Sequence, residues 1–159
     1  MIVTQQDLDQ MENRANQFYS KNKIITSPIW WEVRMTPEWM QHLRQKWKTK
    51  RNIQEIYIRY LCLLSSDKLI SDMKYYQEYK SDYATIVERK NGKNSSVKKM
   101  AEYYWLIGII DTGKSKNRIR LVIRKIFGRD YYELYSVIPS RNSQWYSYFD
   151  SNKKLDQST

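Results

Sequence analysis

The feature that most constrains the fold is a pair of strand-like segments joined by a turn, at residues 118–127 and 131–139. Both segments are rich in β-branched and aromatic residues, and Gly128 opens the link between them, which is the pattern of a β-hairpin. Because the side chains of a strand alternate between two faces, the first segment divides into an apolar face and a basic face. The apolar face holds Ile119, Leu121, Ile123 and Phe127. The basic face, called the arginine face below, holds Arg118, Arg120 and Arg124. We expect the apolar face to be core and the arginine face either to meet an anion or to be a solvated edge that resists aggregation.

The length of the turn decides which residues of the second segment join the arginine face. A two-residue loop at Gly128-Arg129 places Glu133 opposite Arg124. The residues that then share the arginine face are Tyr131, Glu133 and Tyr135. A three-residue loop shifts the register by one and puts Tyr132 and Ser136 there instead. The sequence leaves both registers open.

Composition favours a single folded domain with an anionic partner. The 159 residues include 28 lysines and arginines against 17 acidic residues, a formal charge of +11, which favours nucleic acid or another anionic surface. No apolar run approaches the roughly 20 residues needed to cross a bilayer, and no signal peptide opens the chain, so we expect no membrane partner. Cys62 is the only cysteine and His42 the only histidine. We therefore expect no disulfide, no metal site and no cofactor, and a cytoplasmic location.

Helical patterns precede strand patterns along the chain. Helical spacing of apolar residues or a helix-start signal appears at residues 4–19, from Thr36-Pro37 onward, at 53–65 and at 67–80. Strand patterns appear at residues 29–35, 83–89, 103–110, 118–127, 131–139 and 144–149. We therefore predict one α+β domain, with a mainly helical part at 1–80 packed on a mostly antiparallel sheet of about four strands within 81–150. Residues 93–98 are expected to be a loop, and 151–159 a flexible tail.

One phosphate-loop pattern is present, because Gly108 stands five residues before Gly113-Lys114-Ser115. Such a loop needs a strand, a flexible loop and then a helix. Residues 109–110 belong to the apolar strand pattern, and no helical pattern follows Ser115. We therefore do not expect a nucleotide-binding loop.

The residues that remain suit RNA cleavage without a metal, in which the 2′-hydroxyl of the substrate attacks the adjacent phosphorus. The enzyme must then move two protons and stabilise negative charge on the phosphorane. The candidates for proton transfer are His42, Glu133 and Tyr135, and those for charge stabilisation are Arg120 and Arg124. The candidates for RNA binding are Lys46, Arg118 and Lys125 at phosphates and Tyr131 at a base. Each also has a purely structural interpretation: a packed histidine beside tryptophans, sheet tyrosines, and a glutamate that neutralises Arg124.

Two blocks of the chain resemble a known superfamily. Residues 33–46, Val-Arg-Met-Thr-Pro-Glu-Trp-Met-Gln-His-Leu-Arg-Gln-Lys, resemble the strand-then-helix signature of the barnase, EndoU, colicin and RelE superfamily of metal-independent ribonucleases. The segments at 118–127 and 131–139 resemble the late strands of that superfamily. The resemblance implies that His42 is a general acid or base, that residues 118–124 bind phosphate, and that Ser136 is a site residue of the last strand.

The chain departs from that pattern at Trp47, which stands where a second histidine is often found. If that histidine is essential in relatives, its proton transfer falls here to Glu133, Lys46 or a tyrosine. Members of the superfamily are commonly toxins restrained by an antitoxin or an immunity protein, so the resemblance implies an acidic protein partner.

The expectation from the sequence is therefore a ribonuclease toxin that cleaves RNA through a cyclic phosphate product. Two alternatives stay open. One is a non-catalytic nucleic-acid-binding protein that uses the same basic face. The other is a basic adaptor or inhibitor from a phage or mobile element, which binds an acidic protein.

Overall fold

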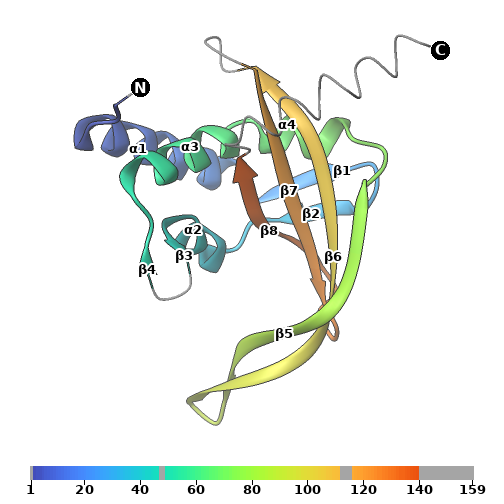
Figure 1. Cartoon of the computed structure of the whole chain (residues 1–159). Helices are drawn as coiled ribbons and strands as arrows, with labels where there is room; N and C mark the ends of the chain where they lie inside the picture. The colour runs from blue at the N-terminus through green and yellow to red at the C-terminus, as the bar shows by residue number, and fades with distance from the viewer. Residues whose placement is uncertain (1, 47–48, 112–115, 140–159) are drawn as a thin grey trace, which may run out of the picture.

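The computed structural model describes residues 2–46, 49–111 and 116–139. The helices are α1 (Gln5–Lys21), α2 (Pro37–Arg44), α3 (Ile53–Leu63) and α4 (Ser66–Asp72). The strands of the main sheet are β1 (Ile24–Ser27), β2 (Trp31–Arg34), β5 (Glu78–Lys90), β6 (Lys93–Asp111), β7 (Lys116–Ile126) and β8 (Tyr132–Pro139). A separate two-stranded pair consists of β3 (Gln45–Lys46) and β4 (Thr49–Lys50). The protein is therefore α+β, with helices gathered on one side of a strongly curved sheet (Figure 1).

The main sheet has the strand order β1-β2-β8-β7-β6-β5. All neighbours are antiparallel except β2 and β8, which run parallel, with Val33 opposite Tyr132 and Arg34 opposite Glu133. The sheet is mostly antiparallel, as predicted, but the described chain holds six strands in it rather than about four, and one of its pairings is parallel. The strand β1 was not predicted, because Pro28, directly after it, indicates a break in the chain's regular structure. In the structure Pro28 belongs to the turn that joins β1 to β2.

The helix starts follow the capping signals in the sequence. Thr4 and Asp7 form a capping box, with the backbone N–H of Asp7 donating to Thr4 Oγ1 at 3.2 Å and that of Thr4 donating to Asp7 Oδ2 at 2.9 Å. The Thr36-Pro37 start of α2 is confirmed. The helix predicted over 67–80 ends earlier, at Asp72, because the chain then joins the sheet, where the N–H of Gln77 donates to Trp105 O at 2.9 Å.

The main core lies between the helices and one face of the sheet, which we call the helix face. The side chains that β7 contributes to it are Ile119, Leu121 and Ile123, each at most 1% exposed. This confirms the apolar face predicted for that strand except at Phe127, which is 77% exposed. Phe127 lies beyond the end of β7, where its N–H donates to Met100 O at 2.8 Å, so it no longer follows the alternation of the strand.

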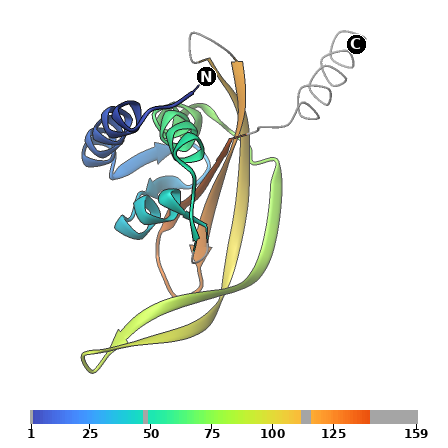
Figure 2. The same cartoon turned by 60° about the vertical axis from the view of Figure 1, so that its left-hand side comes forward.

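The strands β5 and β6 form the longest hairpin of the described chain. Its turn is Asn91-Gly92, with φ values of 51° and 76°, the conformation of a two-residue turn that fits twisted strands. Residues 93–98 are paired with 85–90, so the loop predicted there is wrong. Pairing of β6 with β7 begins only at Ala101. Residues 83–100 therefore form a two-stranded arm that curves away from the end of β7 (Figures 1 and 2).

The register of β7 and β8 places Arg124 opposite Glu133, the pairing expected for a two-residue loop. The link itself is longer than Gly128-Arg129: residues 127–131 lie between the strands, and the N–H of Arg129 donates to Ile126 O at 3.0 Å.

A β-bulge then interrupts the ladder, because Ile123 pairs with Leu134 whereas Val122 pairs with Ser136. Tyr135 is the extra residue of the bulge. Beyond the bulge the pairing of β8 with β7 is shifted by one residue, so that Ser136 lies opposite Val122. Neither of the two predicted registers therefore holds along the whole strand.

The glycine that begins the phosphate-loop pattern lies inside β6 and is covered by a helix. A Cβ atom built on Gly108 would lie 2.2 Å from Cδ1 of Leu69, in α4. The element that follows is the strand β7 rather than a helix, which agrees with the expectation that no nucleotide loop forms. Residues 112–115 lie outside the described residues, as do the predicted strand at 144–149 and the tail at 151–159. Among the helices of the described ranges, none combines the length and apolar character that a membrane crossing requires.

Candidate functional site

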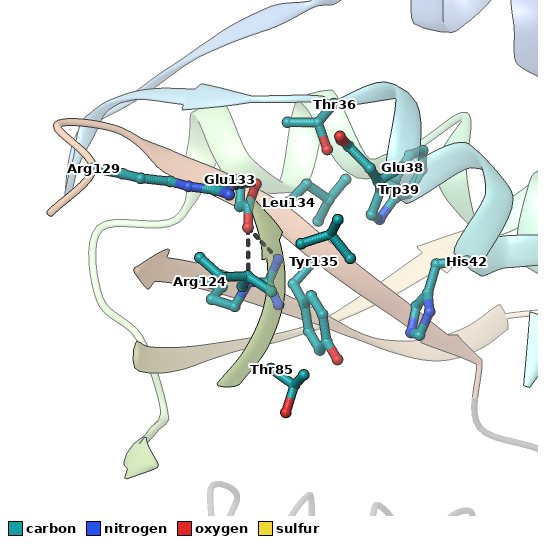
Figure 3. A pocket seen from close by; sticks show the side chains of 12 residues that line it. Thr36, Glu38, Trp39, His42, Thr85, Arg124, Arg129, Glu133, Leu134 and Tyr135 are labelled. Atoms are coloured by element: carbon teal, nitrogen blue, oxygen red, sulfur yellow. Dashed lines mark hydrogen bonds and ion pairs between the residues drawn. The ribbon is translucent and has the colours of Figure 1, made fainter. Parts of the chain in front are cut away.

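A cleft of about 220 Å³ opens where α2, β7, β8 and the arm meet. The helix α2 contributes Trp39 and His42, and β7 and β8 contribute the side chains of the arginine face. The arm closes the opposite side with residues 85–87. Figure 3 shows His42 and Tyr135 side by side and Arg124 bonded to its carboxylate partner. The cleft therefore joins segments that are far apart in the sequence.

His42 is held half-buried against Tyr135. Trp39 and Leu43 point into the core at 3% and 1% exposure, and the intervening His42 is turned toward β8. Its ring lies 5.3 Å from that of Tyr135, with an interplanar angle of 30°. Burial lowers the pKa of His42 below 6.5, and the positive charges of Arg51, Arg59 and Arg124 lower it further. The imidazole is therefore neutral at pH 7 and can accept a proton.

Arg124 is fixed between an aromatic ring and a carboxylate. Its guanidinium carbon lies 4.1 Å from the ring centroid of Tyr135, and its Nε donates to Glu133 Oε1 at 2.7 Å. The carboxylate is 3% exposed and also lies 3.7 Å from Nη1 of Arg129. A charge-assisted bond in a buried setting fixes the plane of the guanidinium. Arg124 thus presents a cation of defined orientation to the cleft.

A second tyrosine supports the first. Tyr103, on β6, packs edge-on against Tyr135 with ring centroids 5.6 Å apart. Burial raises the pKa of Tyr103 above 10, so its phenol keeps its proton at neutral pH. Tyr103 therefore supports the ring that lies between His42 and Arg124.

Four of the predicted catalytic residues meet in the cleft, and two do not. Those that line it are His42, Arg124, Glu133 and Tyr135. Arg120 lies on the same face of β7 but next to the start of β5, with its Nη2 3.5 Å from Glu78 Oε1. Ser136 is 9% exposed and does not line the cleft. Tyr135 follows Glu133 on the arginine face by simple alternation, whereas the bulge places Ser136 opposite Val122, where its side chain is covered.

The predicted RNA-binding residues are dispersed. Lys125 lies on the other face from Arg124, with its Nζ 4.9 Å from the ring of Tyr132. Tyr131 lies between two arginines at the β2–β8 edge, 4.7 Å from the guanidinium carbon of Arg34. Arg118 is half-buried toward the opposite end of β7. The side chain of Lys46 lies outside the described residues, as does Trp47.

Several residues of the cleft were not among the predicted site residues. Trp39 was assigned to the buried stripe of its helix, and it is buried, but its indole Nε1 has no hydrogen-bond partner within the described residues. In Figure 3 this nitrogen is directed toward the cleft. Thr85 and Arg129 also line the cleft. The signal for Trp39 was present, since it precedes His42 by three residues on α2. No local pattern could indicate Thr85, because only the curvature of the arm brings it there.

Metal ligands and reactive thiols are two other kinds of group on which a site could depend. No three side chains of His, Cys, Asp or Glu in the described part of the chain form a group that could hold a metal ion. Cys62 is buried in α3, and this burial raises its pKa to about 12, so it is a packed thiol rather than a nucleophile.

Comparison of the chain with protein-family models, with curated proteins and with solved structures finds no match.

Proposed function

We propose that the protein is a metal-independent ribonuclease that cleaves RNA by attack of a 2′-hydroxyl on the adjacent phosphorus. One observation carries the proposal: a neutral histidine, a tyrosine and a fixed arginine stack in one cleft, with His42, Tyr135 and Arg124 in contact in that order. A base, an acid and a cation within reach of one phosphate are what this reaction needs.

The proposed roles follow from the contacts of each group. His42 accepts the proton of the 2′-hydroxyl as the new bond from O2′ to phosphorus forms. Tyr135 donates its phenolic proton to the 5′-oxygen as the bond from phosphorus to that oxygen breaks. The proton on His42 then returns to the phenolate through solvent, which leaves a 2′,3′-cyclic phosphate and a 5′-hydroxyl. Arg124 stabilises the negative charge of the phosphorane.

Glu133 is given a positioning role in this scheme rather than a role in proton transfer. Both oxygens of its carboxylate are paired with arginines. Oε1 accepts a hydrogen bond from Arg124, and Oε2 lies near the guanidinium of Arg129. A carboxylate held in this way orients the guanidinium and limits the entropy lost when the transition state forms.

The proposal includes the biological setting that the resemblance implies. A cytoplasmic toxin of the barnase, EndoU, colicin and RelE type would be held inactive by an acidic antitoxin or immunity protein. The formal charge of +11 supports a partner of this kind, as it supports RNA.

The test is cleavage of RNA in the presence of EDTA between pH 5 and 9. We expect fragments that end in a cyclic phosphate, and we expect no cut at a linkage whose 2′-hydroxyl has been replaced by hydrogen. Intact RNA at every pH, or cleavage that EDTA abolishes, would overturn the proposal. A His42→Gln variant controls for contaminating nucleases and should lose activity by a factor of about 100 to 10,000.

A non-catalytic nucleic-acid-binding protein is the second candidate, because the ion pairs of the arginine face oppose catalysis. Arg124 is bonded to Glu133, and Arg120 lies 3.5 Å from Glu78, so these guanidiniums stabilise the charge of a phosphorane less than unpaired ones would. This candidate predicts salt-dependent binding with no turnover, and a His42→Ala/Glu133→Ala variant that binds as tightly as the parent.

A further inference from the structure

Within the described ranges, no third strand pairs with the arm, residues 83–100. It consists of β5 and β6 alone, because β7 pairs with β6 only from Ala101 onward. Two-stranded hairpins are marginally stable in isolation. A small apolar cluster holds the root of the arm, with Ala84 and Ile86 packed on Ala101 and Ile126. Beyond that root, the arm extends below the body of the protein (Figures 1 and 2).

The arm is cationic. Four of its basic side chains are exposed, namely Arg89, Lys90 and Lys93 near the turn, and Lys98 nearer the root, opposite Thr85. Glu88 is the one acidic residue between positions 83 and 100, and it forms an ion pair with Lys99. The exposed cations of the arm are therefore not balanced by a carboxylate of its own sequence.

Two of these cations oppose one another in a way that weakens the hairpin. Lys90 and Lys93 are directly paired across the strands, and like charges in that position destabilise a sheet. The tight Asn91-Gly92 turn fixes them in this arrangement. A bound polyanion would remove the repulsion, so the arm is better suited to a complex with an anion than to free solution.

The arm is continuous with the cleft. Thr85 and Val87 line the cleft, and Arg89 lies two residues further along the same strand, about 7 Å away. Tyr83 is 67% exposed at the root of the arm and offers a ring on which a base can stack. Cations that follow a strand, together with an exposed ring, are the elements by which proteins hold single-stranded nucleic acid.

We propose that the arm binds the phosphates of single-stranded RNA that flank the scissile linkage, as a binding site separate from the cleft. This inference rests on the proposed function in that RNA is taken as the ligand. It divides the substrate between two sites: the cleft reacts with one linkage, and the arm holds the neighbouring strand by charge. The arm thus accounts for affinity on long RNA, whereas the cleft accounts for the chemistry.

The test compares two variants with the same loss of charge. The arm variant carries Arg89→Gln, Lys90→Gln, Lys93→Gln and Lys98→Gln. The control variant carries Arg14→Gln, Lys21→Gln, Lys23→Gln and Lys68→Gln, at exposed positions in or beside α1 and α4. The ligand is a 2′-O-methylated single-stranded RNA of about 16 nucleotides, which cannot be cleaved by the proposed reaction. Its Kd is measured by fluorescence anisotropy over a series of salt concentrations.

We expect the arm variant to bind at least tenfold more weakly than the control variant at low salt. The slope of log K against log salt should fall in magnitude by as much as roughly 3, from four phosphate contacts at about 0.7 each. Equal Kd values and equal slopes for the two variants would overturn the proposal. So would a parent protein that does not bind this RNA, the result expected if the arm instead docks on an acidic protein.

Cleavage is measured separately on a dinucleotide, which is too short to reach the arm. The arm variant should keep the kcat/KM of the parent on the dinucleotide and lose it on long RNA, and an equal loss on both substrates would contradict a separate site. A parent that cleaves neither substrate disproves the proposed function, whereas the Kd comparison still decides the role of the arm. Thermal unfolding of the arm variant should show a Tm no lower than that of the parent, because the repulsion between Lys90 and Lys93 is removed.

Discussion

His42 of α2 lies face to face with Tyr135 of β8, with ring centroids 5.3 Å apart. The contact depends on two features of the backbone. The Thr36-Pro37 start determines which side of α2 His42 occupies, and the pairing of Arg124 with Glu133 places Tyr135, two residues further along β8, on the arginine face. A one-residue change in either element would separate the two rings.

The lowered pKa of His42 predicts a dependence of stability on pH. A histidine whose pKa in the folded state lies below its unfolded value of 6.5 binds fewer protons when folded. Its contribution to stability is therefore complete above pH 6.5 and is lost as the pH falls through the folded pKa. We expect the free energy of unfolding, measured in urea, to decrease between pH 7.5 and pH 5.5.

The control for this prediction is His42→Gln, which has no titrating group at that position. The decrease should be smaller in this variant than in the parent. Identical pH profiles for the two proteins would contradict the inferred shift, since carboxylates outside the cleft titrate equally in both.

Tyr135 lines the cleft and Ser136 does not, which predicts that these two neighbouring residues of β8 differ in their effect on turnover. Tyr135→Phe keeps the ring between His42 and Arg124 but removes the phenol that the proposed reaction uses. We expect kcat to fall about 100-fold with little change in the free energy of unfolding. Ser136→Ala, next to it but outside the cleft, should leave kcat unchanged. A larger loss from Ser136→Ala than from Tyr135→Phe would show that the wrong register had been assigned to the site.

Local chemistry determined what could be predicted from the sequence. The Thr4 cap, the Thr36-Pro37 start and the Asn91-Gly92 turn each depend on a few adjacent residues, and the structure confirms them. These features need no knowledge of the rest of the chain. The pairing of Arg124 with Glu133 is one of the two registers that the sequence left open, and only the structure decides between them.

The features that build the cleft depend on contacts between distant segments. The parallel pairing of β2 with β8 joins residues about 100 positions apart in the sequence and has no local signal. The bulge at Tyr135 depends on how β8 packs beneath α2 and α3 rather than on its own alternation. The curvature that brings Thr85 toward His42 follows from the twist of the β5–β6 hairpin, which extends beyond the end of β7. The sequence could therefore indicate most of the reactive residues but not which of them share a cleft.

The buried pair of Arg124 and Glu133 predicts an asymmetric effect on stability. Removing one partner leaves a buried charge without its counter-ion, so Glu133→Ala should lower the free energy of unfolding by about 3 kcal/mol. Arg124→Met alone should be similarly costly, because it leaves the carboxylate. The double variant Arg124→Met/Glu133→Leu should lose clearly less than the sum of the single variants, measured by urea unfolding.

The exposed pair of Lys80 and Asp82 is the matched control, with side chains 60% and 50% exposed. Asp82→Ala should have no measurable effect, because solvent already screens that pair. Additive effects of the Arg124 and Glu133 substitutions would mean that the pair does not couple in the folded protein.

The unpartnered indole of Trp39 predicts a hydrogen bond to the substrate. Its Nε1 is buried at the cleft and finds no acceptor among the described residues, and an unmet buried donor costs about 1 to 3 kcal/mol. A phosphate oxygen in the cleft would satisfy it. Trp39→Phe removes the donor and keeps an aromatic ring, so we expect the affinity for the 2′-O-methylated RNA to fall about threefold to tenfold, as for the loss of one neutral hydrogen bond. Trp31→Phe, at a position that is 83% exposed, controls for a general effect of tryptophan loss and should leave Kd unchanged. If Trp39→Phe binds as well as the parent, the indole is a packing group and the substrate lies elsewhere in the cleft.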